Sequence, residues 1–563
     1  MQYDKITRRS FIVGAAVAGA SLAGAGALAG CKSTSNNSTD SNSGNNDSTA
    51  GGTKSGGIVS YFLTEPACID PYNLKETQGT QVTSNLFDSL FKYDYAKEKL
   101  VPAAAADYEV SPDATIFTFY LTKGVKFHNG DPVTAADFKR AWERLCNPKI
   151  AGTPSQISHH LAQVQGYKEM FIDKTATELT GVKALDDLTL EVTLTAPYAD
   201  FIYVVTHPAL GPVPKAAEDF ANFTEAPIGN GPFKMDGSWK HNQYIQVKRF
   251  DDYYGEKALV DGVDFKIYAT VDSGFTDFQA GNLDWSQIPR GQITQTAQQY
   301  GESDDGYTVN PGKQTLLGPQ SSVYYLLINN NDPVLSNQKL REAISYAVNR
   351  SAITDVLLQG AYTPADGLIP PGINGYRSGA WRTAIYDVVK AKQALAGAGY
   401  PNGEGLAPLT LSYNADGDQE QIMALIQSDL NAIGIQCGLN GMQWADYLDA
   451  LAAGSIQIGS LSQVADYPLM ENFLFSLFYT KNASNYSKYS NPAVDQGIMD
   501  ARGNLDDTKR IAAFQAVDDI IQSTTPIIPV MFYKHTYVGS NRLNNFYFSP
   551  AMIPDLKHAW LSK

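Results

Sequence analysis

The chain has 563 residues, a formal net charge of −15 at pH 7, and a composition that is 43% hydrophobic and 18% charged. This composition is typical of a soluble globular protein, and the length suggests two or three lobes of roughly 100–200 residues each. The negative charge disfavours nucleic acid and anionic lipid surfaces as partners.

An uncharged stretch at residues 11–30 has about the length that crosses a bilayer. Thirteen of its twenty residues are Ala or Gly, which contribute little to membrane insertion, so a signal peptide is favoured over a permanent span. The preceding sequence TRRSFIV resembles a twin-arginine export signal carried by Arg8 and Arg9. The sequence LAGC resembles a bacterial lipobox, which implies that residues 1–30 are removed and that Cys31 is lipidated.

A polar segment follows Cys31. Residues 32–57 consist of Ser, Thr, Asn, Asp, Gly, Ala and two lysines, and cannot bury enough apolar surface to order themselves. As a flexible coil they would reach roughly 30 Å. We therefore expect residues 31–57 to be a lipid-anchored linker that tethers a folded body to the extracytoplasmic face of the membrane, at the bacterial cell surface or in the periplasm.

The body that begins at Ile58 shows strand periodicity in several places. Apolar residues alternate with polar ones at residues 117–122, 188–195 and 263–267, which predicts half-buried strands. In the second of these, Leu188, Leu190, Val192 and Leu194 are expected to share the buried face.

Helical spacing occurs between these strands. Thr134 is predicted to cap a helix with Asp137, and further helices are predicted from Ser336, from about Gln419 to Gly434, and after Asp507. The residues expected to face inward are Phe138, Trp142, Leu145, Leu340, Ala343, Ile344, Ala347, Val348, Ile422, Leu425, Ile426, Leu430, Ile433, Ile511, Phe514, Val517 and Ile521. Strands interleaved with helices predict an α/β body.

Common catalytic motifs are missing from the sequence. No GxSxG, HExxH, P-loop or GxGxxG motif occurs, so no catalytic residue and no cofactor are predicted. The cysteines after Cys31 are Cys68, Cys146 and Cys437. They have no CxxC spacing and allow at most one disulfide within the chain.

Three segments contain residue types that can bind metals, but we interpret them as structural. His159 and His160 are predicted to be a polar loop pair, because adjacent residues rarely ligate one ion alone. Residues 414–420 lack the spacing of an EF-hand loop and predict a turn before a helix. His128 lies beside an Asn-Gly-Asp turn. No metal site is therefore predicted.

Residues 111–148 combine a strand, the turn sequence GVKFHNGDPVTAADF and a helix bearing Trp142. This segment resembles the signature region of the oligopeptide- and dipeptide-binding proteins of ABC importers. Further blocks in family order extend the resemblance over nearly all of residues 58–563, namely IGNGPFKM, FQAGNLDW, LINNNDPVLSNQKLREAISYAVNRSAI, AKQALAGAGYPNGEG and VADYP. The chain is thereby identified as a member of the bacterial extracellular solute-binding proteins, family 5, in a lipoprotein form.

The resemblance implies an α/β, two-lobed clamp of the periplasmic-binding-protein type II, with an extra subdomain in lobe one. Ligand would lie in the cleft, and the lobes would close over it by a hinge in a form that ABC permease subunits recognise. The implied boundaries are 58–98, 229–325 and 529–563 for lobe one, 99–228 for the extra subdomain, and 326–528 for lobe two.

In peptide-binding relatives, the Asp of the ADYP-type motif pairs with the α-ammonium group of the ligand, which here implies Asp466. A carboxylate enclosed by a closing cleft needs a cation, so the role is physically reasonable. The alternative is that Asp466 caps a turn before Pro468. The peptide backbone would be held like an added strand. The other residues implied to contact it are Thr77, Gln463, Val464 and Ala465.

The chain departs from the family pattern near this motif. Relatives often have Trp-Cys where this chain has Gln463 and Val464, and no Lys or Arg lies between Leu451 and Asp466 to meet a ligand carboxylate. Peptide length is therefore open. Gly229 and Gly231 are expected to shape a crossover turn rather than contact ligand.

The expected function is that of a lipid-anchored monomeric receptor that captures oligopeptides and delivers them to an ABC importer. A receptor of the same fold for a metal chelate, an oligosaccharide or another small molecule stays open, because fold does not determine ligand. A surface hydrolase is disfavoured because no nucleophile with a base can be named, and a signalling receptor without transport is the remaining alternative.

Overall fold

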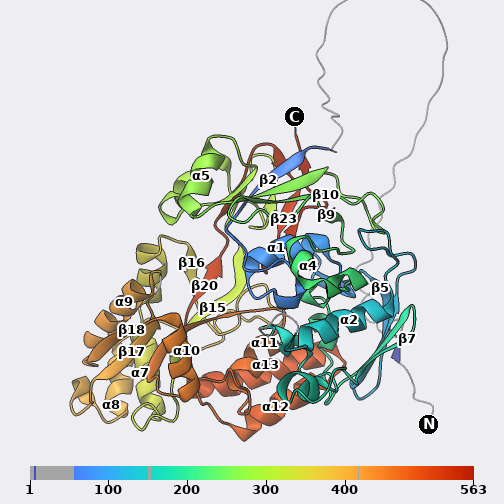
Figure 1. Ribbon diagram of the computed structural model, residues 1–563. Helices are drawn as coiled ribbons and strands as arrows, with labels where there is room; N and C mark the ends of the chain where they lie inside the picture. The colour runs from blue at the N-terminus through green and yellow to red at the C-terminus, as the bar shows by residue number, and fades with distance from the viewer. Residues whose placement is uncertain (1–5, 8–55, 150–153, 416, 563) are drawn as a thin grey trace, which may run out of the picture.

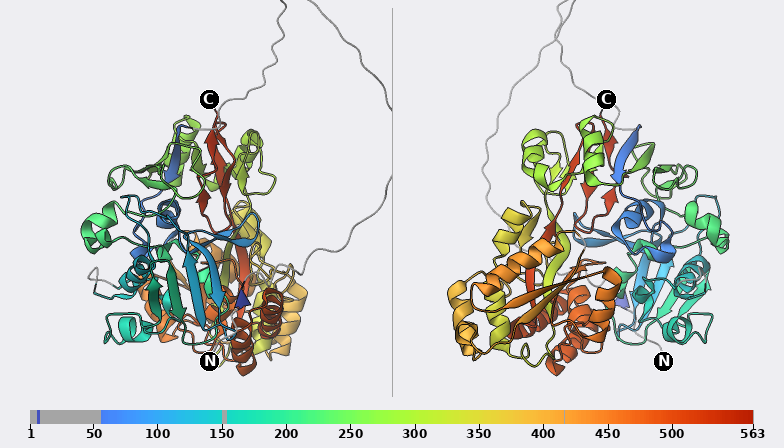
Figure 2. Two further views of the ribbon diagram at one scale, coloured as in Figure 1. Left: turned by 90° about the vertical axis from the view of Figure 1, so that its right-hand side faces the viewer. Right: turned by 60° about the vertical axis from the view of Figure 1, so that its left-hand side comes forward.

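A computed structural model describes residues 6–7, 56–149, 154–415 and 417–562, and they form a two-lobed α/β clamp (Figures 1 and 2). The strands β15 (Pro319–Ile328) and β20 (Ile527–Lys534) belong to the sheet of the second lobe, and the chain crosses to the first lobe next to each of them. The predicted fold class is confirmed. Most of the predicted signal peptide and linker, including Arg8, Arg9 and Cys31, lies outside the described residues.

The first lobe contains a seven-stranded sheet in the order β14-β21-β12-β2-β11-β10-β9. Its strands are β2 (Ile58–Leu63), β9 (Phe233–Met235), β10 (Tyr244–Arg249), β11 (Gly262–Ile267), β12 (Trp285–Gln287), β14 (Thr315–Leu316) and β21 (Tyr537–Gly539), with helices α5 (Val271–Gln279) and α6 (Ile293–Tyr300). Tyr61 on β2 lies opposite Phe265 on β11, and Trp285 packs beside Tyr61. All three side chains are buried, so the core of this lobe is largely aromatic.

A five-stranded sheet in the order β1-β5-β6-β8-β7 lies beside the first lobe, on the right in Figure 1. Its strands are β1 (Ile6–Thr7), β5 (Ala105–Val110), β6 (Ile116–Leu121), β7 (Val182–Asp186) and β8 (Thr189–Thr193). Helix α2 (Ala135–Cys146) packs against β7 and β8 and begins with a capping box between Thr134 and Asp137. Phe138 and Trp142 are fully buried on its inner face.

The second lobe contains a six-stranded sheet in the order β16-β20-β15-β19-β17-β18. Its other strands and helices are β16 (Tyr362–Pro364), β17 (Leu409–Asn414), β18 (Cys437–Met442), β19 (Ile458–Val464), α7 (Gln338–Ala347), α8 (Val388–Gly397), α9 (Gln419–Asn431), α10 (Trp444–Ala453), α11 (Glu471–Phe478), α12 (Pro492–Arg502) and α13 (Asp507–Thr524). Alternate residues of β15 enter two cores. Tyr324 and Leu326 pack with residues of α7 and α9, whereas Tyr325 and Leu327 pack with residues of α11, α12 and α13. Helices therefore cover both faces of this sheet.

Several short elements complete the described fold. They are α1 (Thr77–Leu86), β3 (Phe91–Asp94), β4 (Lys99–Pro102), α3 (Phe201–Val204), α4 (Phe220–Glu225), β13 (Thr308–Val309), β22 (Leu543–Asn544), β23 (Phe546–Phe548), β24 (Pro554–Asp555) and β25 (Trp560–Leu561). In the described part of the chain, no helix combines the length and the apolar character needed to cross a membrane. Cys68, Cys146 and Cys437 are free thiols, so the single disulfide that the sequence allows is not formed among them. The predicted lobe boundaries stay predictions.

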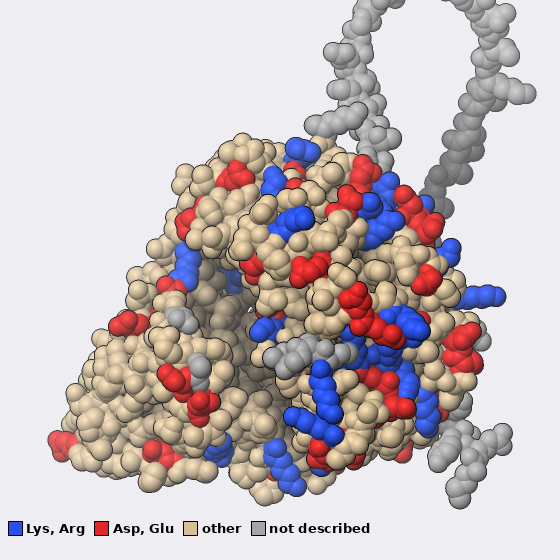
Figure 3. Space-filling model, in the orientation of Figure 1, with Lys and Arg blue, Asp and Glu red and all other residues tan. Residues whose placement is uncertain are grey.

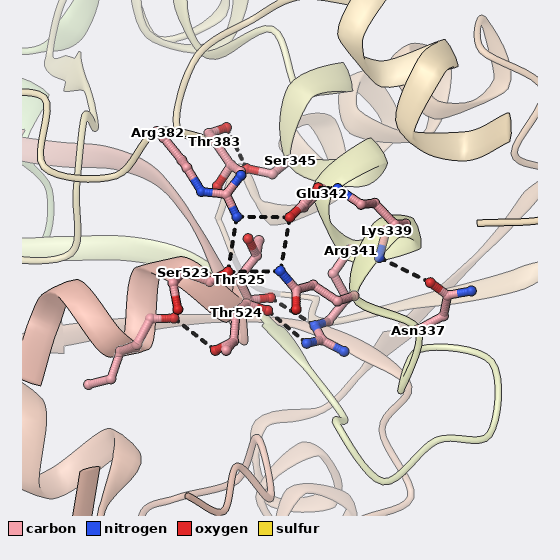
Figure 4. A network of polar contacts seen from close by, with 12 residues as sticks. Asn337, Lys339, Arg341, Glu342, Ser345, Arg382, Thr383, Ser523, Thr524 and Thr525 are labelled. Carbon is pink, nitrogen blue, oxygen red and sulfur yellow. Dashed lines mark hydrogen bonds and ion pairs between the residues drawn. The ribbon is translucent and has the colours of Figure 1, made fainter. Parts of the chain in front are cut away.

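A polar network joins α7 to the end of α13 (Figure 4). The Arg341 guanidinium donates hydrogen bonds of 2.7–2.9 Å to the carbonyls of Leu335, Ser336, Thr524 and Thr525. Glu342 accepts from Lys339 and Arg382, both at 2.8 Å. Because Thr525 shortly precedes β20, the network fixes the segment that leads into this strand.

The predicted elements are confirmed, with differences in detail. The predicted strands correspond to β6, β8 and β11, and the predicted helices to α2, α7, α9 and α13. Leu188, expected inside, is 36% exposed because β8 begins after it. Helix α7 begins at Gln338 rather than at Ser336, and Asn337 caps it, since the Asn337 Oδ1 accepts from the Lys339 N–H at 3.0 Å. Leu425 and Ile511 are only partly buried.

Candidate ligand-binding cleft

A deep hollow opens between the second lobe and the rest of the molecule (Figure 3). In the same orientation, α9 and α10 lie on one side of it and α1 and α4 on the other (Figure 1). Arg290, just before α6, forms an ion pair with Asp418, the residue that precedes α9. The lobes are therefore also joined by charged side chains. We take this hollow as the candidate ligand cleft.

The strand β19 has one fully paired edge and one partly paired edge. It pairs with β15 from Ile458 to Val464, but its pairing with β17 covers only Ile458 and Gly459. The Ser460 backbone bonds in both directions to the Tyr447 hydroxyl, at 2.9 and 3.0 Å. Because backbone direction alternates along a strand, the N–H and C=O groups of Ser462 and Val464 point to the same side, away from β15. This edge can accept another strand.

The three predicted contact residues before Asp466 differ in what they can offer a ligand. Val464 is 49% exposed, and Gln463 is half-buried with its Nε2 donating to the Val464 carbonyl at 3.3 Å. Ala465 is buried, and its N–H donates to the Ser321 carbonyl at 2.9 Å. Val464 is therefore the most exposed of the three residues.

Asp466 follows the free edge of β19 and is exposed. Its Oδ2 accepts from Asn472 Nδ2 at the long distance of 3.4 Å. Among the described residues, no backbone N–H donates to this carboxylate, so the alternative in which Asp466 caps a turn lacks the bonds that a cap requires.

The segment after Asp466 is held by a buried polar cluster that joins the second lobe to residues 99–228. The hydroxyls of Tyr198 and Tyr467 lie 3.0 Å apart, and each donates to Glu471 at 3.1 Å. Arg502 Nε lies 3.1 Å from Glu471 Oε1. Burial and the Glu471 carboxylate raise the pKa of both tyrosines well above the ordinary value, so their hydroxyls stay protonated donors. Sequence reasoning missed this cluster, since its members are far apart in the chain.

Thr77, another predicted contact residue, lies in a helix. It is the first residue of α1, and Glu76 precedes it as the N-cap. The Glu76 carboxylate accepts from the N–H groups of Gln78 and Gly79 at 2.7 and 2.8 Å. Those two N–H groups are therefore used within the helix terminus and are not offered to a ligand.

The glycines of the IGNGP block pack against the end of α1. A Cβ at Gly229 would lie 2.0 Å from the Leu86 carbonyl oxygen, and one at Gly231 would lie 2.7 Å from that of Asn85. The two ring nitrogens of His128 lie 3.1 Å from the Gly229 nitrogen and 3.2 Å from the Gly231 carbonyl oxygen. Burial lowers the pKa of His128 to about 4. Both ring nitrogens of His128 are thus used within the fold.

His159 and His160 lie in a short 3-10 helix, Ser158–Leu161, within residues 99–228. Their rings are 4.5 Å apart, and His207 lies 4.6 Å from His160 on the other side. One side-chain nitrogen of each of His159 and His160 and one Asp466 carboxylate oxygen lie within 4.8 Å of one another. No local pattern indicates that the histidine pair meets Asp466, about 300 residues later in the chain.

Known proteins resemble this chain over most of its length. The model of the bacterial extracellular solute-binding proteins, family 5 Middle, matches residues 99–485. The dipeptide-binding protein DppE of Bacillus subtilis is 29% identical over 510 residues, which are 88% of this chain and 90% of that protein. The oligopeptide-binding protein OppA of Bacillus subtilis is 28% identical over 495 residues, 85% of this chain and 88% of that protein.

The fold of this chain is also similar to that of a solved protein structure. The unliganded open form of the periplasmic murein tripeptide binding protein MppA matches with a TM-score of 0.76 at 25% identity, covering 90% of this chain and 97% of that one. Two α/β lobes around a cleft define a solute-binding clamp. Because the family model covers more than half of the sequence, the chain belongs to family 5 of the bacterial extracellular solute-binding proteins.

Proposed function

We propose that this protein captures oligopeptides in the cleft and delivers them to an ABC importer. One arrangement carries the proposal: the free edge of β19 leads directly to Asp466. An extended peptide added to this edge would bond to the backbone of Ser462 and Val464, and its α-ammonium group would meet the Asp466 carboxylate. Main-chain pairing gives affinity with little dependence on peptide sequence. The relatives named for dipeptides and oligopeptides support this ligand class.

The other predicted contact residues either position β19 or contact the peptide. Gln463 and Ala465 keep β19 in register with β15, because Gln463 lies opposite Val323 and the Ala465 N–H bonds to Ser321. Thr77 would contact the peptide through its side chain, since the neighbouring N–H groups bond to Glu76.

The role of Asp466 is tested by calorimetry with peptides of three to five residues in a buffer containing EDTA. Peptides with a free α-amino group should bind, and N-acetylated versions should bind more weakly. Asp466→Asn should weaken the free-amine peptides by about 2–5 kcal/mol and abolish the difference between the two forms. Asp272→Asn, at an exposed position on α5, is the matched control. Equal binding of both peptide forms by the unaltered protein would remove Asp466 from this role.

The ligand class is tested by native mass spectrometry of protein purified without refolding. A ladder of adducts that dissociate into peptides is the expected result and would give the length range. A single non-peptide mass would contradict the proposal and point to a receptor for another small molecule.

We further propose that the protein is exported through Arg8 and Arg9 and is held at the membrane as a monomer by lipid on Cys31. The motif resemblances and the polar linker support this step. Cys31→Ala should release the protein from the membrane fraction, and replacing both arginines by lysine should retain the precursor inside the cell. Membrane retention of the Cys31→Ala protein would refute lipid anchoring.

A further inference from the structure

The contact between the histidine pair and Asp466 joins two parts of the fold. His159 and His160 belong to residues 99–228, whereas Asp466 follows β19 of the second lobe. Their donor atoms lie within 4.8 Å of one another. His159 and Asp466 are exposed and His160 is 7% exposed, so the cluster can be reached from solvent.

Two imidazoles and one carboxylate are a donor set suited to zinc and similar divalent transition metals. Only neutral imidazole can bind a metal.

Asn472 supplies a second observation at the same place. Its side chain is 5% exposed and contacts Asp466 Oδ2 through Nδ2. Its Oδ1 is buried and has no hydrogen-bond partner among the described residues. The amide that carries this oxygen contacts the Asp466 carboxylate, so the missing partner is accounted for if a metal-bound water reaches Oδ1.

We propose that His159, His160 and Asp466 bind one divalent transition-metal ion, such as Zn²⁺, between residues 99–228 and the second lobe. Tetrahedral ligands at about 2.0–2.1 Å from zinc lie roughly 3.3 Å apart. Donors at up to 4.8 Å must therefore move together. Rotation of these side chains about their χ angles, with a small shift between the two parts of the fold, supplies that movement.

This site does not require the proposed peptide function, although it shares Asp466 with it. Three protein ligands leave at least one coordination position open, as zinc sites that exchange water or substrate do. A metal ion on Asp466 competes with an α-ammonium group for the same carboxylate. Added Zn²⁺ is therefore expected to weaken the binding of free-amine peptides.

Calorimetric titration of EDTA-stripped, dialysed protein with Zn²⁺, without peptide, tests the site. One equivalent should bind, and His159→Ala and Asp466→Asn should each weaken binding by more than about 100-fold, since outer partners of a metal site alone account for 10–100-fold. His241→Ala is the matched control, because His241 is also exposed and contacts two carboxylates, those of Glu65 and Glu225. Titration with Co²⁺ should give visible absorption bands that the two site variants lack.

The outcomes separate this inference from the peptide proposal. Failure to bind one equivalent of Zn²⁺, or binding that persists unchanged in the His159→Ala and Asp466→Asn variants, would overturn the metal site. Neither result would contradict the peptide proposal, because peptide binding is measured in EDTA, without metal. Conversely, loss of peptide binding in EDTA together with intact Zn²⁺ binding would overturn the peptide proposal alone. Circular dichroism melting of each variant shows that a loss of binding does not come from unfolding.

Discussion

Arg510 and Asp200 form a buried ion pair between the second lobe and residues 99–228. Arg510 Nε lies 2.7 Å from Asp200 Oδ1, and the two side chains are 5% and 1% exposed. Both residues also line a cavity of about 90 Å³, together with Asn374 and Phe514. The two parts of the fold thus meet through charge as well as through apolar packing.

We predict that Arg510→Met destabilises the protein by about 3–5 kcal/mol, because it leaves the Asp200 carboxylate buried without its cation. The double variant with Asp200→Asn should recover part of this loss. Urea unfolding of the single and double variants measures both values. Lys248→Met is the control, because Lys248 and Asp236 form an ion pair with side chains 50% and 54% exposed, and its loss should cost less than about 1 kcal/mol. Equal stabilities of the Arg510→Met and control proteins would contradict the prediction.

We predict that the folded protein loses stability at low pH because His535 is buried in its neutral form. Its side chain is fully buried, its Nε2 lies 3.0 Å from the Ser549 carbonyl oxygen, and burial lowers its pKa to about 3. The unfolded chain binds this proton near pH 6.5, so the stabilisation is complete above pH 6.5 and is lost as the pH falls toward 3. Between pH 6.5 and pH 5, the free energy of unfolding should fall by about 2 kcal/mol because of His535.

The measurement is urea unfolding at pH 6.5 and pH 5 for the unaltered protein and for His535→Gln, which keeps a donor but does not titrate. The free energy of unfolding should change less between the two pH values in His535→Gln than in the unaltered protein. His241→Gln, at an exposed position, should leave the difference nearly unchanged. An unchanged difference in His535→Gln would show that other groups determine acid sensitivity.

Proline substitution distinguishes the two edges of β19. The Val464 N–H points away from β15, so Val464→Pro should preserve the fold and remove one donor from the edge proposed to bind peptide. Loss of one such hydrogen bond costs about 0.5–1.5 kcal/mol, or about 2- to 13-fold in affinity. Peptide calorimetry and a thermal melt give the two readouts.

Ala465→Pro is the opposite control, because it removes the hydrogen bond to Ser321. It should lower thermal stability, unlike Val464→Pro. If peptides bind the Val464→Pro protein as tightly as the unaltered one, backbone pairing at this position is excluded.

The network in Figure 4 predicts that the stability of the second lobe depends strongly on Arg341. Arg341→Met leaves the carbonyls at the end of α13 without donors, and we expect a loss of about 3 kcal/mol or more in urea unfolding. Arg341→Lys should recover little, since an ammonium group cannot reproduce the planar fork of donors. Arg382→Ala, at a residue whose side chain is 46% exposed, should cost less than about 1 kcal/mol. Full stability of Arg341→Lys would show that charge alone is sufficient there.

Local patterns predicted most secondary structure because their causes lie within a few residues. The capping box of Thr134 and Asp137 and the alternation of Phe117, Phe119 and Leu121 are written in adjacent positions. The same reasoning erred at Leu188, since strand alternation does not say where a strand begins. Helix α1, which Thr77 begins and Glu76 caps, was not predicted from the sequence.

The sequence by itself determined the leader and linker patterns, the α/β character, the family resemblance and the choice of Asp466 as the candidate anchor. Only the tertiary structure decided which residues surround that anchor. Tyr198 and Tyr467 are 269 residues apart, and His159 is still farther from Asp466. Such contacts depend on how the second lobe packs against residues 99–228. That packing comes from buried surfaces and ion pairs distributed over the whole chain, and no local sequence period records it.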